Sequence, residues 1–300
     1  MHRRSLLAAS ATLGTGLLAG CLGSGDGGGT TTTAPSREVG CPRYSDRIET
    51  VVCTPALADP EGRMAMRPAR STRTLPETSL SFALRNERDS RFESNIYHWR
   101  IQKYVDGRWH HVVPLAWPEP LMYLEPGGSH TWDVAIDNTD LARTLPHPQG
   151  SDAVTVAGLG GGTYSFGVEG RFAGGPEALT AFVTRFELDG PALDLPPTPD
   201  VEDRERRGDR VVLTWRRDGG SRVTYRVTAL KSVPDDARPV IAEQAVRDDA
   251  LRNALALFER WTRIVEIRTN RDALSMQQFG DGDTIAYRDT AYRIEVVPDS

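Results

Sequence analysis

The sequence of 300 residues predicts a mostly β protein in which a β-sandwich is followed by a small α+β domain. Between Cys41 and about Pro197, short runs of alternating apolar and polar residues are separated by Gly, Pro and Asp turns. Short strands at this frequency are typical of a β-sandwich. After a Pro-rich break at 191–203 the pattern changes, and the stretch from Pro239 to Trp261 carries apolar residues at helical spacing.

The N-terminus has the pattern of an export signal. Arg3 and Arg4 precede an apolar run from Leu6 to Leu18. That run is too short for the hydrocarbon core of a membrane, which a helix spans with about 20 residues. We therefore expect a signal peptide over residues 1–21 rather than a membrane-spanning helix. The paired arginines favour the Tat route of export.

The signal ends in Leu18-Ala19-Gly20-Cys21, which resembles the lipobox of prokaryotic lipoproteins. The resemblance implies that Cys21 receives a lipid and becomes the mature N-terminus. Lysine occurs only at positions 103 and 231, so nearly all of the Lys and Arg residues are arginine. In signal and composition the chain is similar to Tat-exported lipoproteins of halophilic archaea. We expect a lipid anchor in the cell membrane, on its extracytoplasmic face; the alternative is that Cys21 is only a small residue in another kind of signal.

Residues 22–39 are mostly Gly, Ser and Thr. Such a segment cannot bury enough apolar surface to order itself, so we expect a flexible tether. The remaining chain divides at the Pro-rich break. We assign residues 40–197 to the sandwich and residues 198–300 to the α+β domain.

Two cysteines remain if Cys21 is lipidated. Cys41 and Cys53 form an even pair, and an exported protein meets an oxidising compartment. The alternative is a metal site, but neither a CxxC spacing nor a nearby histidine accompanies these cysteines. We expect a disulfide between them.

The strongest local signal in the first half is the hairpin at Asp106-Gly107. Both positions of a type I′ turn need positive φ, which this dipeptide supplies. With a two-residue loop, Tyr104 faces Trp109 and Ile101 faces Val112. The expected strands of this half are Ile48 to Cys53, Leu80 to Asn86, Tyr97 to Val105, Arg108 to Val113, Ser129 to Ile136, Gly162 to Gly170 and Leu179 to Leu188.

Three pieces of this half resemble a small bacterial immunoglobulin-like domain of secreted and surface-anchored proteins. They are Asp106-Gly107-Arg108-Trp109, Leu124-Glu125-Pro126-Gly127 and Leu159 to Tyr164. The resemblance implies an immunoglobulin-like β-sandwich, with Tyr164 as a tyrosine corner whose hydroxyl bonds back to the chain. It brings no catalytic residues, because the family shares architecture rather than chemistry. A long insertion at 137–157 leaves the topology at one end open.

The second half predicts strands, a helical region and a final hairpin. Asp235 or Asp236 could cap this helical region, and a break near Asp248-Asp249 is an alternative to one long helix, since that pair could cap a second helix. The final hairpin bends at Arg288-Asp289. Arg210 to Trp215 and Arg222 to Leu230 are expected to pair as a hairpin around Asp218-Gly219-Gly220. The other expected elements are a strand at Ile264 to Arg268, a helical turn at Asp272 to Gln278, and the hairpin strands within Thr284 to Val297.

Several patterns that suggest chemistry have simpler interpretations. Four histidines fall in neighbouring strands of the predicted sheet, where they could form a surface metal site or could simply be solvated. We expect neither a metal nor a cofactor. A copper site of the blue type needs a cysteine near the last strands, and none follows Cys53. Gly158 to Gly162 precedes a strand, so it predicts a turn rather than a phosphate loop. Asp281-Gly282-Asp283 predicts a solvated turn. The sheet histidines are His98, His110, His111 and His130.

Aromatic residues are concentrated in the sandwich. Some must pack in the core, and any that are exposed together would form a patch for a glycan, peptide or protein. Tyr104, Trp109 and Trp117 are the candidate binding patch. In the helical region, Arg247, Arg252, Arg260 and Arg263 predict an ordinary charged face with Asp248, Asp249 and Glu259.

The mild net charge of −5 does not suggest a nucleic-acid partner. We expect no catalytic residues and predict a non-enzymatic binding or scaffold module, anchored to the membrane, with an unidentified protein or glycan partner. One alternative is an enzyme or enzyme inhibitor that uses Arg268, Asp272 or Gln277 of the C-terminal domain. The other is a purely structural surface protein. The sequence sets no oligomeric state.

Overall fold

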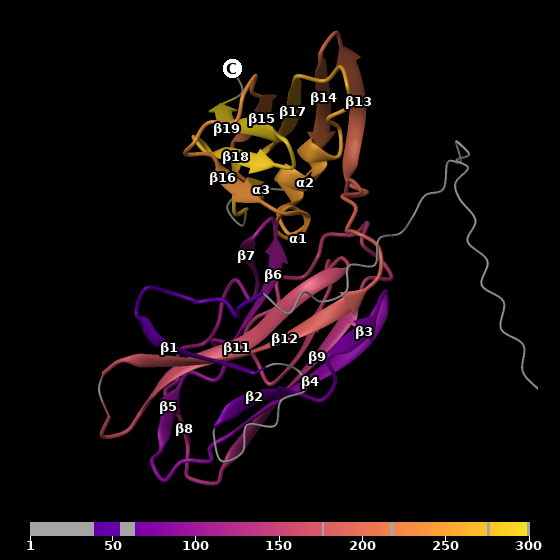
Figure 1. Cartoon of the computed structure of the whole chain (residues 1–300). Helices are drawn as coiled ribbons and strands as arrows, with labels where there is room; N and C mark the ends of the chain where they lie inside the picture. Colours follow the sequence, from indigo (N-terminus) through magenta and orange to yellow (C-terminus); the bar gives the residue numbers. More distant parts are fainter. Residues whose placement is uncertain (1–38, 55–63, 176, 217–218, 275–276, 299–300) are drawn as a thin grey trace, which may run out of the picture. The chain divides into compact units, whose positions relative to one another are not determined.

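The computed structural model describes residues 39–54, 64–175, 177–216, 219–274 and 277–298. The described residues form one compact unit. The predicted signal peptide, Cys21 and nearly all of the predicted tether lie outside the described residues. The described chain is mostly β, as the sequence predicts (Figure 1).

The first half forms two sheets. The larger sheet has the order β1-β12-β11-β5-β8, with β3 paired to β12, β6 paired to β11, and β7 paired to β6. The smaller sheet has the order β10-β9-β4-β2. Figure 1 shows β11 and β12, the longest pair, running side by side. The strands are β1 (Ile48–Thr54), β2 (Ala65–Pro68), β3 (Thr72–Thr74), β4 (Glu77–Arg85), β5 (Phe92–Ser94), β6 (Arg100–Val105), β7 (Arg108–Val113), β8 (Met122–Leu124), β9 (Ser129–Asp137), β10 (Ala153–Val156), β11 (Gly162–Phe172) and β12 (Leu179–Asp189).

The inward faces of these two sheets share one core, which makes a β-sandwich. Phe82 of β4 and Phe166 of β11 stack across it with ring centroids 4.0 Å apart. Trp99 and Trp132 pack beside Phe166 and are fully buried. Alternation along the strands therefore supplies the core from both sides, as the pleat of a sheet requires.

The predicted tyrosine corner is confirmed. The hydroxyl of Tyr164, at the start of β11, donates a hydrogen bond to the carbonyl of Gly160 at 2.7 Å. The predicted hairpin is confirmed near its turn, where Tyr104 pairs with Trp109. The predicted pairing of Ile101 with Val112 is wrong, because a register shift between Ile101 and Gln102 pairs Ile101 with Val113 instead.

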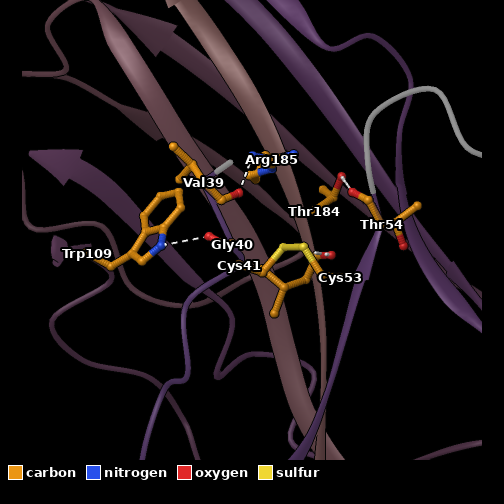
Figure 2. Close-up of a disulfide and its surroundings, with 9 residues drawn as sticks. Val39, Gly40, Cys41, Cys53, Thr54, Trp109, Thr184 and Arg185 are labelled. Atoms are coloured by element: carbon orange, nitrogen blue, oxygen red, sulfur yellow. Dashed lines mark hydrogen bonds between the residues drawn. A yellow bond between two sulfur atoms is a disulfide. The ribbon is translucent and has the colours of Figure 1, made fainter. Parts of the chain in front are cut away.

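The predicted disulfide is also confirmed. Cys41 and Cys53 are bridged, with their Cα atoms 5.6 Å apart. β1, which carries Cys53, pairs in parallel with β12. The segment before Cys41 is held as well, since the indole of Trp109 donates to the carbonyl of Gly40 at 3.0 Å (Figure 2). The bridge therefore fixes the start of the described chain against the large sheet.

The second half forms a mixed sheet of seven strands, in the order β13-β14-β17-β15-β19-β18-β16. Its core lies between the sheet and the helices. The final hairpin bends at Arg288-Asp289 as predicted. The predicted hairpin of Arg210 to Trp215 with Arg222 to Leu230 is wrong, because β17 pairs with both of these strands and lies between them. The strands are β13 (Val201–Arg207), β14 (Arg210–Trp215), β15 (Arg222–Ala229), β16 (Arg238–Val240), β17 (Ile264–Asn270), β18 (Thr284–Tyr287) and β19 (Thr290–Pro298).

The helical stretch predicted from Pro239 to Trp261 is wrong in its first part. Pro239 lies in β16, which pairs in parallel with β18, and α1 (Ala242–Ala245) follows as a single turn. The predicted cap at Asp235 or Asp236 is therefore also wrong. The predicted break is confirmed, because Asp248 caps α2 (Asp249–Leu255) by accepting from the N–H of Leu251 at 2.9 Å. A third short helix, α3 (Arg271–Leu274), follows β17.

Among the described residues, the structure contains no helix with both the length and the apolar character to cross a membrane.

Candidate ligand-binding site

A pocket of about 470 Å³ lies between the β6–β7 hairpin and elements of the C-terminal sheet. Small-molecule sites commonly measure roughly 300–1,000 Å³, so the pocket is large enough for one small ligand. From the C-terminal half, β16, α1 and β18 contribute to its walls. The lining residues are Lys103, Val105, Asp106, Arg108, His110, Ala192, Leu193, Pro239, Val240, Ile241, Ala242, Glu243, Ala286, Tyr287 and Arg288.

The hairpin presents one face to this pocket. Lys103 pairs with His110 across the two strands, and Val105 pairs with Arg108. Because side chains alternate along a strand, these four lie on the same face of the hairpin. The turn at Asp106, whose φ is +48°, brings the two strands together at the pocket mouth. The alternation was visible in the sequence, but nothing local indicated what this face would contact.

A buried ion pair forms the floor. Nζ of Lys103 lies 2.5 Å from Oε1 of Glu243, and their side chains are only 10% and 2% exposed. Burying a single charge costs several kcal/mol, roughly, unless a partner and further hydrogen bonds compensate it. Here the N–H of Gly160 also donates to Oε1, at 3.1 Å. The single hydroxyl proton of Tyr164 is shared between the carbonyl of Gly160, at 2.7 Å, and Oε1, at 3.2 Å. The pair joins β6 of the sandwich to α1 of the C-terminal half.

The two oxygens of Glu243 differ in their surroundings. All three donors, from Lys103, Gly160 and Tyr164, reach Oε1. Among the described residues no hydrogen bond reaches Oε2, and Glu243 lines the pocket. Its charge also acts on the pKa of two other lining residues, His110 and Tyr287. Oε2 is therefore the acceptor that the floor offers to a ligand.

The turn from Gly158 to Gly162 is what allows this close contact. A Cβ on Gly160 would lie 2.5 Å from the backbone nitrogen of Leu193 and 3.0 Å from Oε1 of Glu243. Gly158 has φ +69°, and a Cβ there would lie 2.8 Å from Val246. Only glycine permits both the conformation and the approach. A strand follows these glycines, so the segment is a turn, as predicted, and its role is to seat α1.

The predicted charged face of the helical region is wrong for Arg247 and Arg252. Both are buried, at 3% and 0% exposure. Arg247 donates to the carbonyls of Gly158 at 3.0 Å and Ala157 at 2.5 Å, and burial lowers its pKa to about 10. Carbonyls from the sandwich thus take the place of solvent around this guanidinium.

The guanidinium of Arg252, in α2, is likewise surrounded by backbone carbonyls. Its donors reach the carbonyls of Leu141, Ala142 and Arg143 and, at 2.5 Å, that of Pro196. The first three belong to the insertion at 137–157, which also contributes β10 to the smaller sheet. The insertion therefore holds the C-terminal half through Arg252 and also through Thr144, whose hydroxyl donates to Asp249 of α2 at 2.7 Å.

Two arginines stand at the pocket mouth. Arg108 and Arg288 are both exposed, and the guanidinium of Arg288 lies 5.2 Å from the ring centroid of Tyr287. Arg288 has φ +51°, an uncommon conformation for a side chain of this size. Burial and the charge of Arg108 lower the pKa of His110, which favours its neutral form. Burial raises the pKa of Tyr287, whose hydroxyl keeps its proton.

The predicted binding patch lies apart from this pocket. Tyr104 and Trp109 contact each other on the opposite face of the hairpin, with ring centroids 5.2 Å apart. Trp117 stacks on His98 at 3.9 Å and has no ring contact with the other two among the described residues. The structure therefore brings together two of the three residues, all half-buried.

The most exposed aromatic side chains lie elsewhere. Trp261, after α2, is 72% exposed, and the guanidinium of Arg260 lies 5.0 Å from its ring centroid. Tyr123 of β8 is 50% exposed and lies under the guanidinium of Arg91. The helical spacing predicts Trp261 on an apolar face, so the sequence pattern does not reveal its exposure.

The four sheet histidines do not gather in one cluster. His98 is half-buried, and burial, together with the charges of Arg100 and His111, lowers its pKa to about 4. Burial also lowers the pKa of His111. His130 contacts Asp152 at 3.0 Å, and His110 lines the pocket. In the described part of the chain, no group of three or more His, Cys, Asp or Glu side chains is arranged to hold a metal ion.

The residues predicted for an alternative enzyme site lie in the C-terminal half and make contacts there. Gln277 donates to the carbonyl of Ala273 at 3.2 Å and accepts from the N–H of Ala250. Asp272 lies against the turn at 219–220, and Arg268 is exposed on β17. None of the three lines the pocket beside the hairpin. The Asp281-Gly282-Asp283 turn uses its carboxylates for backbone N–H groups at Val296 and Gly280.

A second pocket, of about 510 Å³, lies over the outer face of the smaller sheet. Its walls are mostly small side chains from β4, β9 and β10. The charged residues there are Arg73 and Asp133, and Arg73 already donates to the carbonyl of Ser79 at 2.6 Å. This shallow groove offers a ligand fewer fixed polar groups than the pocket beside the hairpin.

Comparison with known proteins does not assign the chain to a group. No protein-family model matches it, and a search of curated proteins finds no significant match.

Proposed function

We propose that this protein is an extracytoplasmic lipoprotein, held to the cell membrane by a lipid on Cys21, that acts as a non-enzymatic binding module. The observation that carries the binding function is the pocket of about 470 Å³ between the β6–β7 hairpin and the C-terminal sheet. It combines apolar walls with a few fixed polar groups, which is the usual composition of a small-molecule site.

The buried contacts around the pocket support a preformed site. Arg247 and Arg252 hold the C-terminal half to the sandwich through backbone carbonyls. The pair of Lys103 and Glu243 fixes the floor between the same two parts. A site whose groups are already in place loses less free energy on ordering when a ligand binds.

The same floor favours binding over catalysis. A general acid or base must exchange a proton with its substrate at the working pH. Lys103 and Glu243 instead neutralise each other at 2.5 Å in a buried setting. Of the lining residues, His110 is the side chain that could most readily exchange a proton with a ligand. Among the described residues, however, no nucleophilic side chain forms a hydrogen bond with it.

A ligand screen tests the binding function. The detergent-extracted protein is heated in the presence of single members of a library of sugars, organic acids, amino acids and nucleotides. We expect at least one class to raise the melting temperature in a concentration-dependent way, because a ligand of the native state stabilises it by mass action. The proposal is contradicted if no member of the library raises the melting temperature.

The anchor is tested separately. We expect Cys21→Ser to move the protein from the membrane fraction to the soluble fraction, and the intact mass of the wild-type protein to match a lipidated chain that begins at Cys21. A cytosolic wild-type protein that keeps residues 1–20 contradicts the anchor and leaves the pocket unaffected.

A further inference from the structure

We propose that the pocket beside the β6–β7 hairpin binds a small hydroxylated carboxylate, such as a sugar acid. This inference rests on the proposed binding function and specifies its ligand. The carboxylate would lie between Arg108 and Arg288 at the mouth, and a hydroxyl would donate to Oε2 of Glu243 at the floor. The ring would pack against Leu193 and Ile241 on the wall.

The charges of the lining residues favour one negative charge on the ligand. Lys103 is neutralised by Glu243, which leaves Arg108 and Arg288 against Asp106. The lining residues therefore carry an excess of one positive charge. A single carboxylate on the ligand balances that charge, whereas a dianionic phosphate would bring one negative charge too many. Arginine also suits a carboxylate geometrically, since its planar fork makes two parallel hydrogen bonds.

The floor favours a hydroxyl over an ammonium group. Oε2 of Glu243 accepts no hydrogen bond from the described residues, so it is free to accept one from a ligand. A ligand ammonium would also be attracted to a carboxylate, but here it would lie beside the ammonium of Lys103, which is 2.5 Å from Oε1. Two like charges in a buried site repel strongly. A neutral hydroxyl avoids that repulsion and still satisfies the acceptor.

The mouth adds a second, independent observation. Arg288 occupies the left-handed region at φ +51°, in a turn where Gly, Asn or Asp would be favoured. A residue held in a sparsely populated conformation commonly marks a functional position. In this turn the side chain of Arg288 lies over Tyr287 and lines the pocket. The strained turn therefore places a guanidinium opposite the hairpin.

Titration calorimetry of the detergent-extracted protein with glucuronate tests the proposal. Glucose lacks the carboxylate, cyclohexanecarboxylate lacks the hydroxyls, and leucine carries an ammonium group. We expect glucuronate to bind about tenfold or more tightly than each of the three, since a charged hydrogen bond contributes roughly that factor. Equal or tighter binding of any control, or no binding of glucuronate, overturns the inference.

A matched pair of variants locates the site. Arg288→Gln removes a charge from the pocket mouth, and Arg293→Gln removes the same charge from β19 at an exposed position outside the pocket. We expect only Arg288→Gln to weaken glucuronate binding, by about tenfold. Equal effects of the two variants overturn the inference. If glucuronate fails while another library member binds, the binding function stands and only the ligand class is wrong; if no member binds, the function itself fails.

Discussion

The ammonium of Lys103 lies 2.5 Å from Oε1 of Glu243, although 140 residues separate the two in the sequence. One belongs to β6 of the sandwich and the other to the short helix α1. Their contact ties together the two halves that differ in sequence pattern, and it forms the floor of the pocket. We therefore expect the stability of the protein and the proposed ligand binding to depend on the same pair.

Removing one member of this pair should destabilise the protein. Glu243→Gln leaves the buried ammonium of Lys103 without its compensating charge, so we expect a loss of about 3–5 kcal/mol in the free energy of unfolding. Chemical denaturation measures it. Glu295→Gln is the control, because the side chain of Glu295 is 46% exposed and lies 3.8 Å from Arg226; its loss should stay below about 1 kcal/mol. Similar losses for the two variants would show that the buried pair has no special role.

The glycine turn makes a second prediction. Gly160→Ala would place a Cβ 2.5 Å from the backbone nitrogen of Leu193, so backbone has to move. We expect a loss of about 1–3 kcal/mol, as for other overpacked sites. Gly280→Ala is the matched control, since a Cβ there meets nothing within 4 Å. Thermal unfolding compares the two, and an unchanged melting temperature for Gly160→Ala would contradict the packing of the turn on Leu193.

The disulfide makes a third prediction. Cys41 and Cys53 close a loop of 12 residues in sequence separation, so the double variant with serine at both positions should lose about 3 kcal/mol. Dithiothreitol should lower the free energy of unfolding of the wild-type protein to that of the double variant, and it should leave the free energy of unfolding of the double variant unchanged. The prediction is contradicted if dithiothreitol does not change the unfolding midpoint of the wild-type protein.

The N-terminal cap of α2 makes a prediction about pH. Burial raises the pKa of Asp248 from 3.8 to about 7, against the lowering effect of three backbone N–H donors. The native state then binds more protons than the unfolded state between these two values. Its stability should therefore fall as pH rises through that window, on the order of 1 kcal/mol per pH unit from this group.

Asp248→Asn isolates the effect of that group. The variant is less stable overall, because its amide nitrogen cannot accept from the N–H groups of Gln278 and Phe279. The informative quantity is the slope of stability against pH, which should be flatter in the variant between pH 4 and 7, roughly. Parallel slopes would mean that Asp248 does not titrate in this range.

Much of the sandwich was predictable because its signals are local. Alternation gave the long strands, Asp106-Gly107 gave the hairpin turn, and the position of Tyr164 gave its hydrogen bond to Gly160. The bulge beside Ile101 was not predictable, since it depends on pairing with β7 rather than on composition. The charged edge strand β13 was missed because its residues are nearly all polar and exposed, so alternation is absent.

The pocket was not predictable because its parts are distant in the sequence. Helical spacing places Arg247 and Arg252 in an ordinary charged region, yet both are buried because carbonyls of the sandwich reach them. Glu243 had no local signal at all. The Gly158 to Gly162 turn was recognised, but its contact with α1 depends on tertiary packing. Long-range contacts, not residue patterns, decide which charged groups are buried.

The most direct test of the account is the ligand screen repeated on a variant with a filled pocket. Ala286→Trp places a bulky ring in the pocket wall, and Ala83→Trp adds the same ring to a half-buried position on β4 outside the pocket. We predict that ligands that raise the melting temperature of the wild-type protein also raise that of Ala83→Trp and leave that of Ala286→Trp unchanged. Equal stabilisation of both variants would contradict a binding site between the β6–β7 hairpin and the C-terminal sheet.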